Sequence, residues 1–313
     1  MSEWVANFFR ISLAVVARFS RARSVKLSRL LVKFCGRSEA WAVTEINLRA
    51  CFPELSHSEI NGLTKSSLEQ MFLMFFELGQ LKHWSKEELL GSVEVVGADV
   101  LEQALASENG VLLLVPHIGN WELICAHLGE RHELAALYDP PKVAGLETVV
   151  LEARERFSAK MYPIGVGGLR SVMRILRNGG LLAVLPDQVP ARGAGVYTEF
   201  FGQTALTMNL VDQLVTKTKA TVVLGWVQRV AKVEGDWRQG YDYRLSYEAL
   251  QLPNFAEHVV LPSHESARQV ATARAVNEAI ENVIKLAPEQ YQWEYKRFKR
   301  PPNLGKANIY RRQ

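Results

Sequence analysis

The sequence predicts an α/β protein with a mixed, mostly parallel sheet flanked by helices, preceded by a helical, membrane-associating N-terminal segment. From about residue 93 onward, short apolar runs typical of buried strands alternate with segments of helical periodicity. Such alternation implies parallel pairing with helices on the faces of the sheet. The first 50 residues have a different composition, in which basic and large apolar residues are interspersed. We therefore expect a membrane-associating region at residues 1–45 and a second domain, with the chemistry, at residues 46–313.

The N-terminal segment predicts a helix that lies on a membrane. Residues 4–19 are apolar but contain Arg10 and Arg18, whereas a simple membrane span needs about 20 apolar residues in a row. One arc of the helix would hold Trp4, Val5, Phe8, Phe9, Ile11, Val15, Val16 and Phe19. Further basic residues follow at Arg21, Arg23, Lys26, Arg29 and Lys33. This pattern is typical of a helix in an anionic membrane surface. Docking on the protein's own core and a tilted span are the alternatives.

The next elements follow in order. Residues 4–50 have helical character, and residues 52–56 form a break in which Ser56 would cap a helix over residues 57–83. The apolar run at residues 71–76 predicts a buried face on that helix, with lipid contact as the alternative. Strands are expected at residues 111–116, 134–138, 181–186, 221–230 and 241–247. Helices are expected near residues 99–107, 121–130, 146–159, 168–178, 207–218 and 264–286.

Composition excludes several classes of protein. With 313 residues, 48% of them hydrophobic, the chain can bury a large core. The net charge of +4 is compatible with anionic lipid or acidic partners, and the basic residues are too dispersed to indicate a nucleic-acid binder. Three separated cysteines, Cys35, Cys51 and Cys125, argue against a disulfide framework and a zinc ribbon.

His117 and Glu122 form the most informative motif. They follow the apolar run at residues 111–116, and open α/β sheets place their chemistry where strands end. Histidine is the usual general base near neutral pH, and a carboxylate commonly orients it. On one continuous helix the two side chains would point about 140° apart. They can meet only if His117 stays in the turn and Glu122 lies in the first turn of the helix. The alternative is a capping histidine beside a solvated glutamate.

Other catalytic and cofactor motifs are absent from the sequence. It contains no G-x-S-x-G, no G-x-x-x-x-G-K-[ST] and no H-E-x-x-H pattern. Residues 165–170 begin like a dinucleotide fingerprint, but Arg170 stands where the third glycine belongs. We therefore expect no cofactor and no metal ion.

Five segments in order resemble the bacterial lipid A late acyltransferases (lauroyl/myristoyl transferases), within the wider glycerolipid acyltransferase-like fold. The His-x4-Glu motif is similar to the family's signature, and its glutamate resembles the lipid A branch. The other four segments are NLRACFPEL (47–55), GLR with LRNGG and LPDQ (168–188), FFGQTALT (200–207) and PEQYQWEYKRF (288–298). The resemblance covers about residues 40–301. It departs at the N-terminal helix, where Arg10 and Arg18 interrupt the hydrophobic anchor typical of the family.

The resemblance implies transfer of an acyl chain from an acyl carrier protein thioester to a hydroxyl of a lipid A precursor, at the cytoplasmic face of the inner membrane. His117 would be the general base, and Glu122 would accept a hydrogen bond from its other ring nitrogen. The candidate substrate-binding residues are Arg170, Asp187, Gln188, Arg154 and Asn120. Arg170 would contact the oxyanion or a phosphate, and Asp187 and Gln188 would orient the acceptor or merely cap a strand. Backbone N–H groups at the start of helix 121–130 could also stabilise the oxyanion.

Two other functions fit the same sequence. The chain could acylate another membrane lipid, such as a lysophospholipid, an ornithine lipid or a glycolipid. It could also be a membrane-binding protein that keeps the fold without the reaction. The residues alone do not choose between carrier protein and coenzyme A as donor, and they fix neither the acyl-chain length nor the acylated position.

Overall fold

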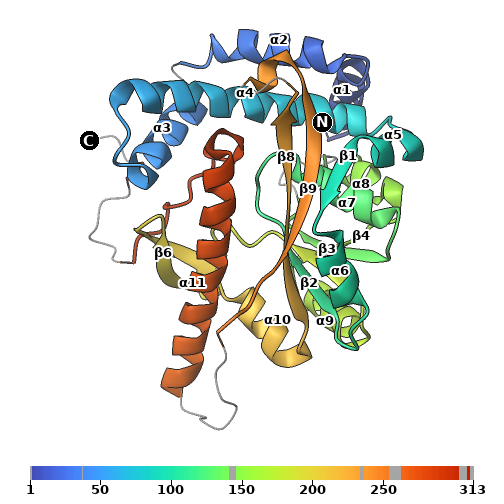
Figure 1. Cartoon of the computed structure of the whole chain (residues 1–313), viewed down its shortest axis with the longest axis vertical. Helices are drawn as coiled ribbons and strands as arrows, with labels where there is room; N and C mark the ends of the chain where they lie inside the picture. Colours follow the sequence, from blue (N-terminus) through green and yellow to red (C-terminus); the bar gives the residue numbers. More distant parts are fainter. Residues whose placement is uncertain are drawn as a thin grey trace.

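The computed structural model describes residues 2–36, 38–140, 146–232, 236–253, 262–302 and 309–310. Within these residues, a seven-stranded sheet has the order β1-β9-β8-β2-β5-β3-β4 (Figure 1). Its strands are β1 (Val93–Val96), β2 (Val111–Leu114), β3 (Leu134–Tyr138), β4 (Lys160–Pro163), β5 (Leu181–Val184), β8 (Thr221–Ala231) and β9 (Tyr241–Ala249). The five strands from β8 to β4 run parallel, whereas β9 is antiparallel to β8 and carries β1 alongside it. The predicted α/β class and mixed sheet are confirmed.

Helices cover both faces of the sheet. Helices α6 (Ala98–Leu105) and α7 (Trp121–Gly129) pack with Val111 and Leu113 of β2 in one core. Helices α9 (Val166–Arg177), α10 (Leu210–Thr218) and α11 (Pro262–Leu286) pack with Leu112 and Leu114 in the other. All four residues of β2 are buried, because successive side chains point to opposite, covered faces. Helix α8 spans Leu146–Arg154.

A long helix, α4 (His57–Leu81), crosses the sheet near the carboxyl ends of the parallel strands, where the arrow of β8 points in Figure 1. The predicted cap is present, because the Ser56 side chain accepts a hydrogen bond from the backbone N–H of Glu59 and the Glu59 carboxylate accepts one from the backbone N–H of Ser56. Helices α1 (Ser2–Val16), α2 (Arg21–Val32) and α3 (Glu39–Cys51) pack against α4. A short helix, α5 (Lys86–Gly91), leads into β1.

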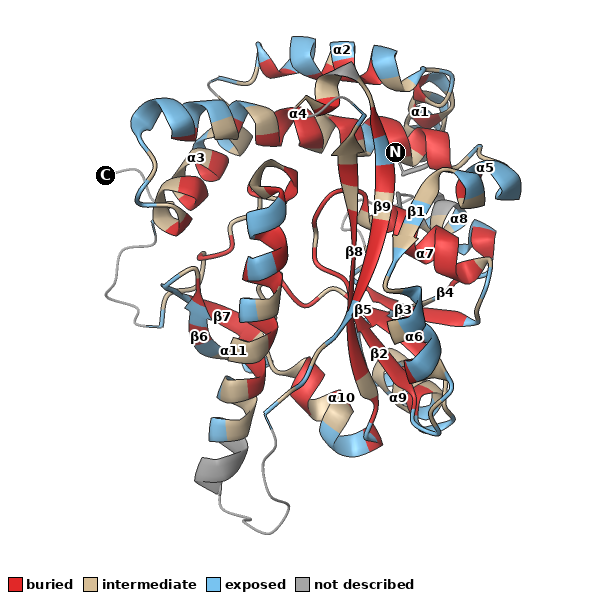
Figure 2. Ribbon diagram, viewed as in Figure 1, coloured by how far each residue is buried: buried red, intermediate tan, exposed pale blue. Residues whose placement is uncertain are grey.

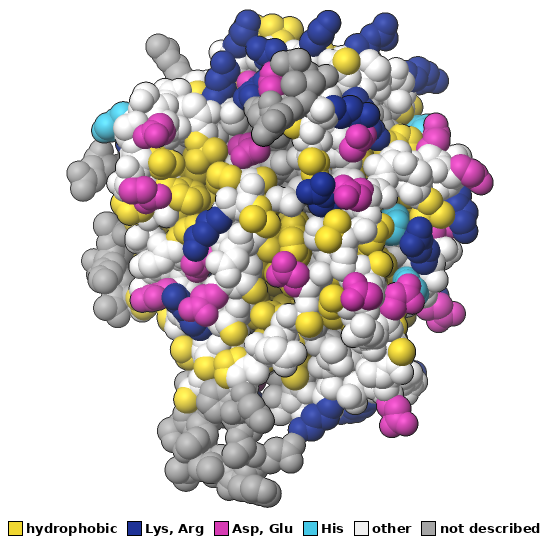
Figure 3. Space-filling view, viewed as in Figure 1, with side chains coloured by type: hydrophobic (Ala, Val, Ile, Leu, Met, Phe, Trp, Pro, Cys, Tyr) yellow, Lys and Arg dark blue, Asp and Glu magenta, His cyan; other side chains and the backbone are white. Residues whose placement is uncertain are grey.

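The N-terminal helices bury one side and expose the other (Figure 2). Val16 and Phe19 of the predicted apolar arc pack against Phe76 of α4, together with Leu13, so the arc docks partly on the protein's own core. Of the rest of the arc, Trp4, Phe8, Ile11 and Val15 are exposed and Phe9 is half-buried. The side chain of Val5 lies outside the described residues. Exposed basic residues follow the outer side of α2, at Arg23, Lys26, Arg29 and Lys33, and Figure 3 shows Lys and Arg side chains gathered along that edge. None of the described helices combines the length and apolar character that crossing a bilayer requires.

Four strands were missed by the sequence patterns. β1 and β4 are short edge strands whose side chains are half-buried or exposed, so they lack the continuous apolar run of a central strand. β6 (Gly195–Phe200) and β7 (Gln203–Met208) form a separate antiparallel hairpin. Phe201 and Gly202 at its turn both have positive φ, as a tight two-residue hairpin requires.

Candidate active site

The loop from β2 to α7 carries His117 and is held in an unusual path by Gly119. Gly119 has φ = 59°, and a Cβ at this position would lie 1.8 Å from the carbonyl oxygen of Val227. Only glycine tolerates both the conformation and the close backbone approach. The loop therefore passes directly over β8 and brings His117 to the edge of the sheet, as the sequence predicted.

The C-terminal segment fixes this loop from the other side. The backbone N–H of Gly119 donates to the carbonyl of Gln290, and the N–H of Gln292 donates to the carbonyl of His117, at 2.9 and 3.0 Å. Trp293 and Arg297, farther along the segment, are buried, and Arg297 donates to the carbonyl of Leu206 and the hydroxyl of Thr207. Residues 290–298 thus hold the histidine loop in place.

Asp187 is the residue that orients His117. Its Oδ1 lies 2.7 Å from Nδ1 of His117, and its Oδ2 accepts the backbone N–H of His117 at 2.8 Å. Asp187 follows β5, which pairs directly with β2, so both residues leave the sheet at the same edge. The Asp187 side chain is almost fully buried, whereas the His117 side chain is 12% exposed. Burial favours the neutral acid, but the charge and hydrogen bonds of His117 outweigh it and lower the pKa of Asp187.

Gln188 defines which nitrogen of His117 acts as a base. Its Nε2 lies 3.2 Å from Nε2 of His117 and also donates to Oε1 of Gln292 at 3.0 Å. The Gln188 amide nitrogen can only donate, so Nε2 of His117 is the acceptor, and Nδ1 carries the proton that Asp187 binds. The imidazole therefore presents an unprotonated Nε2, as a general base must.

Glu122 does not form the expected hydrogen bond with His117. It is paired with Arg154, whose Nε donates to Oε2 of Glu122 at 2.8 Å, and Nδ1 of His117 is already occupied by Asp187. Burial works against the charged form of Glu122, but Arg154 and the nearby His117 outweigh it and lower its pKa. Arg154 is thus committed to a buried carboxylate, although the sequence suggested contact with phosphate or carrier. Glu122 acts on His117 through its charge only.

The structure gives the other candidate residues different surroundings. Asn120 begins α7 and is buried, and its Oδ1 has no hydrogen-bond partner. Arg170 is exposed on α9, and in the described part of the chain no hydrogen bond or ion pair joins it to His117 or Asp187. Its contact with an oxyanion or a phosphate stays a prediction. Trp121 packs its ring against His117, with centroids 5.0 Å apart.

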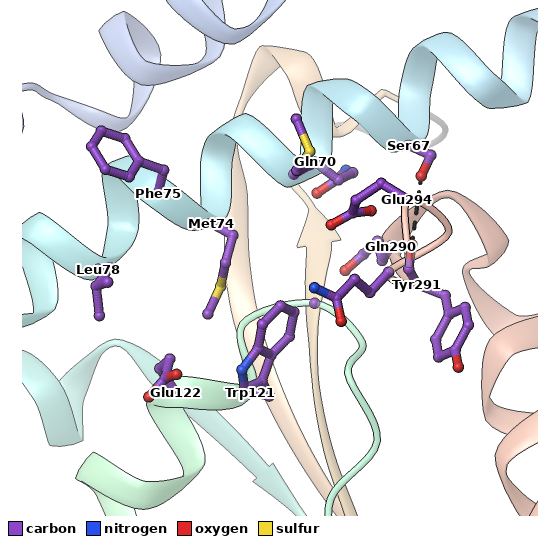
Figure 4. Close-up of a pocket in the computed structure, with 13 residues that line it drawn as sticks. Ser67, Gln70, Met74, Phe75, Leu78, Trp121, Glu122, Gln290, Tyr291 and Glu294 are labelled. Carbon is purple, nitrogen blue, oxygen red and sulfur yellow. Dashed lines mark hydrogen bonds between the residues drawn. The ribbon is translucent and has the colours of Figure 1, made fainter. Parts of the chain in front are cut away.

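A cavity of about 260 Å³ lies between α4 and the histidine loop (Figure 4). One part of its wall is apolar, formed by Met71, Met74, Phe75 and Leu78 of α4 together with Trp121. The other part is polar, formed by Ser67, Gln70, Glu122, Gln290, Gln292 and Glu294. His117 is not part of the cavity wall, but it contacts Trp121 and Gln292, which are. The apolar run at residues 71–76 therefore faces both the core and this cavity.

Neither a metal ion nor a cysteine nucleophile fits the site as described. Among the residues that the structure places, no three His, Cys, Asp or Glu side chains gather as metal ligands would. Cys125, one turn after Glu122, is buried, and burial with the charge of Glu122 raises its pKa to about 12. Its thiol is therefore protonated and unreactive at neutral pH.

Known proteins of one kind resemble this chain over nearly its full length. The family model described as bacterial lipid A biosynthesis acyltransferase matches residues 1–300. A lipid A biosynthesis acyltransferase of Haemophilus influenzae is 25% identical over 303 residues, covering 93% of this chain and 85% of that protein. The lipid A biosynthesis palmitoleoyltransferase of Escherichia coli K12 is 26% identical over 269 residues, covering 86% and 81%. The lauroyltransferase of the same organism is 25% identical over 276 residues, covering 88% and 84%.

Proposed function

Because this chain belongs to the bacterial lipid A biosynthesis acyltransferase family and is an acyltransferase, we propose that it transfers a fatty acyl chain from an acyl carrier protein thioester to a hydroxyl of a lipid A precursor. The observation that carries the proposal is the His117–Asp187 pair beside a half-apolar cavity. A base next to an apolar slot suits the activation of a hydroxyl close to an acyl chain.

The His117–Asp187 pair supplies the general base of the reaction and the group that orients it. Nε2 of His117 takes the proton of the acceptor hydroxyl as its oxygen attacks the thioester carbonyl, and Gln188 moves off Nε2 to admit the hydroxyl. Asp187 holds the imidazole in the correct tautomer and stabilises its charged form, with Glu122 contributing a second buried negative charge nearby. When the tetrahedral intermediate collapses, the imidazolium returns the proton to the departing thiolate. A new ester and a free thiol result.

Direct transfer, without an acyl-enzyme, is supported by the chemistry of the site. The cysteine nearest Glu122, Cys125, is held in its protonated form. His117 is bonded to carboxylate and amide groups rather than to a serine or threonine hydroxyl that it could activate. Nε2 of His117 is thus available to the acceptor's own hydroxyl once Gln188 has moved away.

The acyl chain would occupy the apolar part of the cavity, along Met74, Phe75 and Leu78. The exposed apolar stripe of α1 and the basic face of α2 would rest on the anionic cytoplasmic face of the inner membrane, where a lipid acceptor is found. Since α1 and α2 both pack on α4, the membrane-facing surface and the cavity share one helix.

The test is acyl transfer from a series of acyl carrier protein thioesters to tetraacylated and pentaacylated lipid A precursors in detergent. Wild-type transfer and a loss of about 10²–10⁴-fold in a folded His117→Ala variant are expected. Undiminished turnover in that variant would refute the role of His117. Transfer to lysophospholipid, ornithine lipid or glycolipid instead would reassign the acceptor, and faster transfer from acyl-coenzyme A would reassign the donor. Lipid binding without any transfer would contradict the proposed reaction.

A further inference from the structure

A buried glutamine in the cavity wall has its amide orientation fixed by an arginine. Gln70 lies on α4 and is 3% exposed. Its Oε1 accepts a hydrogen bond from Nη1 of Arg229 at 2.9 Å. A guanidinium group only donates, so the oxygen of Gln70 must face Arg229 and the NH₂ group must face away from it. Figure 4 shows the Gln70 side chain reaching from α4 into the space above the histidine loop.

The NH₂ group of Gln70 has no partner. Of the buried side-chain nitrogen and oxygen atoms that lack a hydrogen bond in the described ranges, it is the one whose residue lines the cavity. Gln290, in the same wall, differs, because its amide exchanges two hydrogen bonds with the backbone of Arg229. A buried donor without a partner costs about 1–3 kcal/mol, so an acceptor group that entered the cavity and reached this NH₂ group would remove that cost.

The surroundings of Gln70 select a neutral acceptor. Two carboxyl groups, those of Glu122 and Glu294, line the same cavity and would repel an anion such as phosphate. Burial raises the pKa of Glu294, which also indicates a weakly polar environment. The charge of Arg229 offers no compensation, because this fully buried guanidinium is paired with Glu77. The rest of the wall is apolar, so the acceptor would be attached to a hydrocarbon chain.

We propose that Nε2 of Gln70 donates a hydrogen bond to a neutral carbonyl oxygen of the substrate, whose hydrocarbon chain lies along Met74 and Phe75. The carbonyl can be an amide, ester or thioester. Two substrates of the proposed function, on which this assignment of the ligand rests, contain such a group: the thioester donor with its amide-containing arm, and the acceptor with its own acyl chains. Gln70 is thus a substrate-binding residue that recognises the polar end of an acyl chain.

Direct binding tests this assignment without requiring turnover. Equilibrium dialysis of the full chain in detergent would compare radiolabelled N-methyldodecanamide with dodecyl methyl ether, which lacks the carbonyl. Wild type should bind the amide about tenfold more tightly. Gln70→Glu keeps an oxygen for Arg229 but replaces the donor by a second oxygen, and Gln70→Met removes the donor without adding charge. Both variants should lose the preference.

Gln80→Glu provides the matched control. Gln80 is a second buried glutamine of α4, but it donates to the carbonyl of Phe19 and lies outside the cavity wall. This variant should keep the preference for the amide. Equal binding of the two probes by wild type, or an unchanged preference in both Gln70 variants, would overturn the proposal.

Kinetics then distinguish the two sources of the carbonyl. With the acylation reaction running, Gln70→Met should raise the KM for one substrate about tenfold and leave the other unchanged. A raised KM for the thioester assigns the carbonyl to the donor, and a raised KM for the lipid assigns it to the acceptor. If wild type catalyses no acyl transfer, the proposed function is contradicted. The dialysis result would still decide whether Gln70 binds a carbonyl.

Discussion

At the scale of single residues, the assignment of Asp187 changes the expected catalytic unit. The sequence motif places Glu122 five residues after His117, yet Glu122 is bound by Arg154 and Asp187 holds the imidazole. The two motif residues, His117 and Glu122, therefore differ in the role that we propose for each. In the proposed reaction His117 exchanges the proton, and Glu122 supplies a buried charge that Arg154 neutralises in part.

Asp187→Asn should reduce kcat by about 10²–10⁴-fold with little change in KM. Asparagine can donate to Nδ1 as well as accept, so it permits the wrong tautomer, in which Nε2 carries the proton and cannot act as a base. Steady-state kinetics with a saturating lipid acceptor would measure the effect. Asp212→Asn is the matched control, because Asp212 is also buried but pairs with Arg268 between α10 and α11. Equal activities of the two variants would contradict the role of Asp187.

At the scale of elements, α4 contributes side chains both to the cavity wall and to the hydrophobic cores. Its apolar run contributes Met71, Met74 and Phe75 to the cavity and Leu73 and Phe76 to cores. A substitution on the cavity side of α4 can therefore change the shape of the cavity while the core-facing side of the helix stays packed. Chain-length selectivity should therefore respond to substitutions on this one face.

Met74→Trp should shift the preferred donor toward shorter acyl chains, and Met74→Ala toward longer ones. Because one methylene changes discrimination by about 1–3 kcal/mol, the ratio of kcat/KM for two donors that differ by two carbons should change by at least about tenfold. Competition between thioesters of different length, followed by mass spectrometry of the product, measures that ratio. Lys65→Trp adds an equally large ring to an exposed position of α4 and should leave the profile unaltered. An identical profile in the Met74 variants would place the acyl chain elsewhere.

The local patterns predicted most elements but not their order in the sheet. Buried runs such as residues 111–114 and 181–184 are continuous and apolar, so they are recognisable as central strands. Edge strands such as β4 lack that pattern because solvent covers part of them. The pairing of β5 with β2 depends on contacts between distant segments of the chain. This pairing brings Asp187 to His117. The pairing was therefore beyond a motif search, although Asp187 and Gln188 were recognisable as polar residues at a strand end.

At the scale of the whole molecule, the exposed apolar stripe of α1 and the basic side of α2 are both features typical of proteins that bind a lipid membrane. Trp4 is 73% exposed and Phe8 57%, which is unusual for large side chains that have no membrane or protein to cover them. Arg23, Lys26, Arg29 and Lys33 would attract anionic lipid, and salt should weaken this part of the attraction.

Phe8→Asp should lower partitioning onto vesicles of phosphatidylethanolamine and phosphatidylglycerol by at least about tenfold. Burying a phenylalanine contributes about 1.5–3 kcal/mol, and the new carboxylate is repelled by anionic lipid. Cosedimentation at low and high salt measures the effect. Val96→Asp is the control, since Val96 is also exposed but ends β1, at the edge of the sheet opposite to α4. Equal losses in both variants would argue against a specific membrane-facing surface.

The contact between residues 290–292 and the histidine loop also sets the order in which the enzyme matures. During synthesis, His117 leaves the ribosome roughly 10–35 s before Gln290, at 5–20 residues per second. Until then the backbone groups of His117 and Gly119 lack their hydrogen-bond partners. The nascent chain therefore contains His117, but the loop that carries it is not yet held in position. The α1 and α2 helices emerge before His117. Under the proposed function, a growing polypeptide would thus settle at the lipid surface early, whereas its catalytic geometry would be complete only after residues 290–292 have been synthesised.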